Sequence, residues 1–272
     1  MKVVKETVRI ALAALLLAGA AGVWARAQST AAGARGAGGG KAVAQEPTPE
    51  EIIKQFTEKE TEFYKAWMNY TYRQTANIRI RSKDGRPSNE WMDLVSEVVF
   101  DDDGSRDVRQ LKRRGQLKSL RFTREDEEII NNLNPFALTT AELPLYDLKY
   151  EGKERVDELN CHVFAVKPKK IKSGRLYFEG RIWVDDLDLQ VVRTVGKAVP
   201  QSPSGQLFPE FETLRQMIDG KYWFPVWTHA DERLRFVDST VRIEETITYD
   251  DYRKFDTKAT IRYGDLEGEG EE

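Results

Sequence analysis

The sequence is poor in the residues that build disulfides and metal sites. It has one cysteine, Cys161, and two histidines, His162 and His229, among 272 residues. A single thiol has no partner within the chain, which excludes a fold built on disulfides. So few soft ligands also exclude an ordinary zinc site. We therefore expect no metal centre, and no motif in the sequence indicates a cofactor.

Neither sign of charge is in large excess, because 42 Lys and Arg stand against 45 Asp and Glu. A nucleic-acid-binding surface would normally make the domain basic, so we expect no nucleic-acid partner. Glycine-rich motifs that cradle phosphates are absent as well. What remains is the composition of an ordinary globular protein, with 40% hydrophobic and 32% charged residues.

One long apolar run lies near the N-terminus. Residues 1–27 combine a basic start, an apolar run from Ile10 to Val23 and the triplet Ala25-Arg26-Ala27, which is typical of a secretory signal peptide. The apolar core of about 14 residues is shorter than the ~20 that a membrane-spanning helix needs. We expect export and cleavage after Ala27, and no transmembrane span in the mature chain.

The mature chain divides by composition into three parts. Residues 28–46 are rich in Gly and Ala and are expected to form a disordered linker, whereas 47–255 are expected to form a single domain. Residues 256–272 should hold a strand end and an acidic, mobile tail. Cleavage would remove four basic residues and one acid, which leaves 38 basic against 44 acidic residues, a net charge of −6.

Two helices can be placed from start and stop signals. Thr48 followed by Pro49 is typical of a helix start, and the apolar residues Ile52, Phe56, Phe63 and Trp67 fall on one helical face. This pattern predicts a helix that runs to about Trp67. A second helix is predicted from Arg124 to about Leu133, where Pro135 stops it.

Beyond Asn69 the apolar period changes to two, which indicates half-buried antiparallel strands. Val241, Ile243, Ile247 and Tyr249, for example, alternate with polar residues, and Gly-containing turn signals separate such runs. A large antiparallel sheet curls, so it must close on itself or have its concave face covered. Two short helices could lid an apolar cavity or simply fill it, and the pattern leaves both open.

Residues suited to catalysis do not form a recognisable constellation. Cys161 and His162 are neighbours on a predicted strand and so point to opposite faces, although His229 could approach Cys161 across strands. We expect Cys161 to be buried and inert, and the protein not to be an enzyme. The basic run 167–172 is either a solvated loop or a contact for anionic headgroups.

Three segments together resemble a known family. They are GKERVDELNCHVFAVKPK at 152–169, YFEGRIWVD at 177–185 and DGKYWFP at 219–225. These segments are similar to outer-membrane lipoprotein-sorting proteins of the LolA/LolB type, which are related to sigma-factor regulators of the same superfold. The resemblance covers about residues 50–255.

The resemblance implies a mainly β (α+β) fold with an unclosed half-barrel of eleven antiparallel strands, lidded by short helices. It also implies an arginine that holds the lid shut, which cannot be assigned from the sequence. With this fold in view, about eleven strands can be placed. They lie near 69–81, 91–101, 105–112, 116–123, 144–153, 160–168, 175–185, 189–198, 207–217, 221–235 and 239–252.

In function, the resemblance implies a periplasmic lipoprotein-sorting or lipid-carrier protein of the cell envelope, non-enzymatic and monomeric, that shelters acyl chains in transport. Its ligand would be a lipid or acylated lipoprotein, with an inner-membrane donor and an outer-membrane acceptor. A sensor that binds lipid or misfolded envelope proteins and relays to a membrane partner is the alternative, followed by an exported hydrolase. Face periodicity predicts the apolar cavity residues Phe56, Phe63, Trp67, Phe136, Phe164, Val166, Phe178, Ile182, Ile243 and Ile247.

Overall fold

A computed structural model describes residues 46–82, 84–100, 105–133, 135–201, 208–237 and 239–255. The expected signal peptide (1–27), the expected linker up to residue 45 and the expected tail (256–272) lie outside the described residues. Within the described ranges, no helix is both long and apolar enough to cross a membrane.

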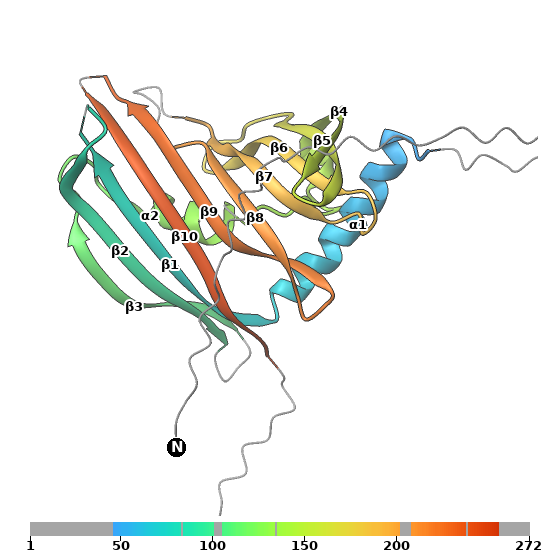
Figure 1. The fold of residues 1–272 in the computed structure, drawn as a ribbon, viewed down its shortest axis with the longest axis horizontal. Helices are drawn as coiled ribbons and strands as arrows, with labels where there is room; N and C mark the ends of the chain where they lie inside the picture. The colour runs from blue at the N-terminus through green and yellow to red at the C-terminus, as the bar shows by residue number, and fades with distance from the viewer. Residues whose placement is uncertain are drawn as a thin grey trace, which may run out of the picture. The chain divides into compact units, whose positions relative to one another are not determined.

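The described residues form one ten-stranded sheet in which every neighbouring pair is antiparallel (Figure 1). The strands are β1 (Tyr70–Arg81), β2 (Pro87–Phe100), β3 (Arg106–Gln116), β4 (Tyr146–Val156), β5 (Leu159–Pro168), β6 (Tyr177–Asp185), β7 (Val191–Val199), β8 (Phe211–Ile218), β9 (Tyr222–Arg235) and β10 (Thr240–Lys254). Their order is β3-β2-β1-β10-β9-β8-β7-β6-β5-β4, so β3 and β4 are the two edges. The predicted unclosed antiparallel sheet is confirmed.

One of the eleven predicted strands is missing from the described part of the chain. The segment predicted as two strands, 105–112 and 116–123, forms the single strand β3, and residues 117–123 form no strand. Gly115, which suggested a turn, does have a positive φ of 82°, but its neighbours stay paired with β2. Leu117, Leu120 and Phe122 instead pack against the apolar core. These residues connect β3 to the next helix, and we call 117–123 the crossing segment.

The first helix, α1 (Pro49–Trp67), begins and ends as predicted. Thr48 and Glu51 form a reciprocal capping box, and Pro49 occupies the first turn. All four residues of the predicted apolar face are buried, and they divide between two clusters. Ile52 and Phe56 pack with residues of β4 to β9, whereas Phe63 and Trp67 pack with β1, β2, β9 and β10. The helix therefore covers both halves of the sheet's inner face, which is the predicted lid arrangement.

The second helix is short and changes form along its length. α2 (Arg124–Glu128) continues as one π-helical turn, η1 (Ile129–Leu133), so together they match the predicted range. Ile129 and Ile130 are buried. A short 3₁₀ turn, η2 (Leu143–Leu145), then leads into β4.

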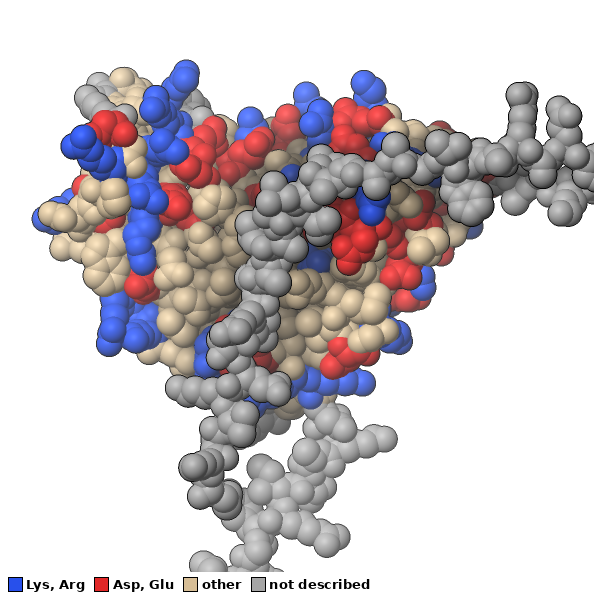
Figure 2. Space-filling view, in the orientation of Figure 1, with Lys and Arg blue, Asp and Glu red and all other residues tan. Residues whose placement is uncertain are grey.

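Basic side chains are concentrated on the edge strand β3. Arg106, Arg109, Lys112, Arg113 and Arg114 lie on this strand, and Figure 2 shows Lys and Arg along the margin on that side. Charged edge strands resist pairing with other chains. The predicted basic run begins with the last two residues of β5 and continues into the following loop, and it is exposed apart from the buried Pro168. Its contact with anionic headgroups stays a prediction.

Candidate ligand cavity

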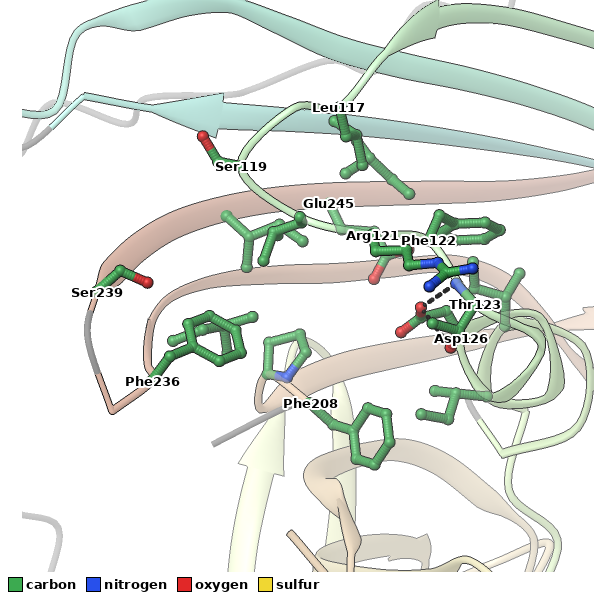
Figure 3. Close-up of a pocket in the computed structure, with 17 residues that line it drawn as sticks. Leu117, Ser119, Arg121, Phe122, Thr123, Asp126, Phe208, Phe236, Ser239 and Glu245 are labelled. Carbon is green, nitrogen blue, oxygen red and sulfur yellow. Dashed lines mark hydrogen bonds between the residues drawn. The ribbon is translucent and has the colours of Figure 1, made fainter. Parts of the chain in front are cut away.

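A cavity of about 550 Å³ lies between the sheet and the segments that cross over it (Figure 3). Strands β1, β9 and β10 contribute one wall, and the crossing segment with α2 and η1 contributes another. The lining residues are Ile78, Leu117, Ser119, Leu120, Arg121, Phe122, Thr123, Asp126, Ile129, Ile130, Phe208, Pro209, Leu234, Phe236, Ser239, Ile243 and Glu245. Most of these side chains are apolar, and the exposed Ser119, Arg121 and Ser239 mark where the lining reaches solvent.

Two smaller hollows adjoin this cavity. One of about 240 Å³ shares Phe122 and Ile130 with it and extends toward β2 and β3. Another, of about 410 Å³, shares Ser119 and reaches Ile80 and Val241, but its other lining residues are polar or charged, among them Arg81 and Arg242. The inner face of this half of the sheet is therefore incompletely filled over several strands.

The inward face of β10 carries one acid among apolar residues. Burial alternates along the strand, so that Val241, Ile243, Glu245, Ile247 and Tyr249 face the core. Glu245 is 8% exposed, and no hydrogen bond or ion pair to its carboxyl exists within the described residues. Figure 3 shows it beside the cavity, on the side that the crossing segment covers. The count of apolar residues on a face does not single out Glu245, although an acid at an inward position of an apolar series is a signal in the sequence.

Burial and, to a smaller extent, the nearby negative charge of Asp126 together raise the pKa of Glu245 to about 7. A buried carboxyl without a partner loses the hydration of its charged form, which favours the protonated form. Asp126 itself accepts hydrogen bonds from the backbone N–H and hydroxyl of Thr123, at 2.6 and 2.9 Å. The cavity therefore combines apolar walls with two carboxyl groups.

A buried ion pair joins the lid to the sheet near the centre of the fold. Arg215 on β8 donates two hydrogen bonds to Glu60 on α1, at 2.9 and 3.1 Å, and both side chains are at most 1% exposed. The same guanidinium donates to the backbone oxygen of Phe136 and lies 4.2 Å from the ring centre of Phe63. One arginine thus connects β8, α1 and the segment after η1.

Neither member of this pair was found from the sequence. Glu60 lies on the apolar face of α1, and Arg215 takes the inward position after Phe211 and Thr213 on β8. Both are charged residues at buried positions where the helical or strand repeat predicts apolar residues. Glu245 departs from its repeat in the same way.

The ten predicted cavity residues are all buried, but they belong to two clusters. Phe56, Phe136, Phe164, Val166, Phe178 and Ile182 share one, and Phe63, Trp67, Ile243 and Ile247 share the other. The first cluster has close ring contacts, such as the stacking of Phe136 on Phe178 with centroids 4.4 Å apart. Of the ten, Ile243 lines the largest cavity described above. The ligand contacts of all ten stay predictions.

The possible pairing of Cys161 with a histidine does not form. Cys161 on β5 and His229 on β9 are separated by β6, β7 and β8 in the sheet. Cys161 is fully buried, and this burial raises the pKa of its thiol to about 12, so the reactive thiolate is disfavoured. His162 instead contacts the hydroxyl of Tyr150 at 3.2 Å. Among the described residues, no group of three or more His, Cys, Asp or Glu could hold a metal ion.

Comparison with known proteins finds similarity only among solved structures. No family model matches the chain, and no curated protein matches it. A DUF1329 family protein from Desulfovibrio piger is 15% identical, covers 77% of this chain and 95% of its own, and has a TM-score of 0.37.

Two further solved structures are similar at 11% identity. An outer membrane lipoprotein-sorting protein domain from Vibrio parahaemolyticus covers 78% of this chain and 95% of its own, with a TM-score of 0.38. A LolA superfamily protein from Nitrosomonas europaea covers 75% and 93%, with a TM-score of 0.34.

Proposed function

We propose that this protein is a periplasmic carrier of lipids or acylated lipoproteins, without enzymatic activity. The observation that carries the proposal is the apolar cavity of about 550 Å³ between an open antiparallel sheet and the segments that cover it. Its volume lies within the range of about 300–1,000 Å³ that is usual for small-molecule sites.

The hydrophobic effect supports an acyl chain as the occupant. Each methylene that leaves water contributes about 0.8 kcal/mol, so ten methylenes contribute roughly 8 kcal/mol before the costs of association. Ile78, Leu234 and Ile243 from three adjacent strands offer such a chain apolar contacts. The hollow toward β2 and β3 offers a longer chain the apolar residues Ala76, Leu94 and Val108, whereas the other hollow is lined mostly by polar and charged residues.

The buried ion pair supports a lid that opens as a unit. Movement of α1 or of the segments after β3 away from the sheet would widen access to its inner face, and Arg215 connects both to β8. Opening this contact would leave Glu60 and Arg215 separated, and isolated buried charges are costly. Arg215 is therefore our candidate for the lid-closing arginine that the family resemblance implies.

The predicted signal peptide supports the location. An exported protein that hides acyl chains can carry them between two membranes through water, from an inner-membrane donor to an outer-membrane acceptor. A monomer suffices for this role, because one chain supplies both the sheet and its cover.

The test is native mass spectrometry of the mature protein, purified without detergent from an exporting host, followed by lipid extraction of the same sample. We expect bound mass that extracts as acylated lipid. Ile243→Trp, which fills the cavity, should reduce the loaded fraction at least severalfold. Leu187→Trp is the matched control, because Leu187 is 85% exposed and does not line the cavity. A protein that stays free of lipid and rejects added lipid would contradict the carrier proposal.

A further inference from the structure

The acids of the cavity define what the polar end of its ligand must be. Glu245 projects from β10 into an apolar enclosure, is more than nine-tenths buried and has no partner within the described residues. Asp126 on α2 lines the same cavity, close enough for its charge to act on Glu245. A buried acceptor without a donor carries an unfavourable desolvation free energy, so a ligand that supplies the donor should bind more tightly.

The other elements around the cavity contribute little charge. β1 and β9 contribute Ile78 and Leu234, and the segments beside them contribute Phe208, Pro209, Phe236 and Ser239. Arg121 of the crossing segment is the one basic residue of the lining, and its side chain is exposed. An anionic head placed at Glu245 would therefore meet two carboxyl groups, without a buried cation to offset them.

We propose that this cavity binds an amphiphile with a cationic amine in its head, with the ammonium between Glu245 and Asp126 and the apolar body against Ile78, Leu234 and Ile243. The inference rests on the carrier function proposed above and specifies the chemistry of the cargo. An ammonium has three donors and each carboxylate has several acceptor positions, so one head can bond both acids. Such charge-assisted hydrogen bonds are about twice as strong as those between neutral groups.

The site should also respond to pH. The pKa of Glu245 lies at about 7 without a ligand, and a bound ammonium would lower it by favouring the charged form. An alkylamine stays protonated over pH 5–9, as a lysine side chain does. Amine binding should therefore be strong at pH 8 and weaken toward pH 5, as Glu245 takes up a proton, whereas a neutral amphiphile of equal length should bind alike at both.

The experiment measures binding of dodecylamine, 1-dodecanol and dodecanoate to the mature protein by titration calorimetry at pH 8 and pH 5. At pH 8 we expect dodecylamine to bind roughly tenfold or more tightly than dodecanol, from one or two charge-assisted hydrogen bonds. Glu245→Gln should remove most of this preference and leave dodecanol binding within about twofold. Glu244→Gln is the matched control, because Glu244 neighbours Glu245 but faces outward, where it pairs with Arg81.

The outcomes separate this inference from the carrier proposal. Three results would each overturn the amine site and leave the carrier proposal intact. They are equal binding of amine and alcohol, tightest binding of dodecanoate, and an unchanged amine preference in Glu245→Gln. Failure of all three amphiphiles to bind would instead contradict the carrier function. Glu245→Gln keeps the size of the side chain and removes a buried charge, so it should fold.

Discussion

Removal of Arg215 should destabilise the protein far more than removal of an exposed arginine. Arg215→Met takes away both bonds to Glu60 and the bond to the Phe136 carbonyl, and it leaves a carboxyl that is 0% exposed without its cation. Loss of one partner of a buried pair typically costs about 3–5 kcal/mol. We expect the free energy of unfolding to fall by this amount in urea denaturation at pH 7, followed by tryptophan fluorescence.

The double variant identifies the cause. Arg215→Met with Glu60→Leu removes both charges and takes away the partners that Arg215 gives the Phe136 carbonyl and Glu60 gives the Val191 N–H, so its loss should be only about 1–3 kcal/mol. It should therefore be more stable than Arg215→Met alone. Arg181→Met is the control, because Arg181 pairs with Glu151 at 2.7 Å with its side chain 59% exposed and should cost less than about 1 kcal/mol. A double variant as unstable as the sum of the single variants would refute the argument.

Two further predictions concern stability. Glu245→Gln should raise the free energy of unfolding by up to about 3 kcal/mol at pH 8 and leave it unchanged near pH 4.5. The reason is that the native pKa of Glu245 is raised from 4.5 to about 7, so the wild type loses stability as the pH rises through that range. Equal effects at both pH values in urea unfolding would contradict this. Gly180→Ala should cost at least about 2 kcal/mol, because an added Cβ would meet the Val195 carbonyl and Gly196 across β6 and β7. At Gly174 an added Cβ would meet no atom, but the φ of 76° is unfavourable for alanine. Thermal unfolding of Gly174→Ala should therefore show a cost of about 1 kcal/mol. Equal losses for the two glycine variants would refute the steric account.

Most of the fold could be predicted because its signals are local. A cap at Thr48 and an apolar face from Ile52 to Trp67 determine α1 without reference to the sheet. The alternation of apolar and polar residues determines the strands in the same way, since each strand needs one buried face. The crossing segment differs because its apolar residues pack against the core although the segment pairs with no strand; these residues are Leu117, Leu120 and Phe122. Apolar content there predicts burial correctly but not the hydrogen-bonding partner.

The candidate site was harder to predict because its residues break the apolar pattern. Glu60, Arg215 and Glu245 occupy inward positions, and a search that counts apolar residues on a face leaves them out. Each of the three is a candidate for function or for a structural link because its burial has to be offset. For Glu60 and Arg215 the offset is their mutual contact, whereas Glu245 has no partner within the described chain. That difference makes Glu245 on β10 the residue for which a ligand would supply the missing partner.

The same alternation on two halves of one sheet produces a packed core in one and a cavity in the other. Near Phe136, Phe164 and Phe178 the rings pack against each other and against α1, so little space remains. Near Ile78 and Ile243 the inner face carries aliphatic side chains, and its cover is the crossing segment and a short helix that bends into a π turn. Side-chain volume and the distance to the cover decide whether an inner face is filled. Periodicity reports neither quantity, so the face could be predicted from the sequence and the cavity could not.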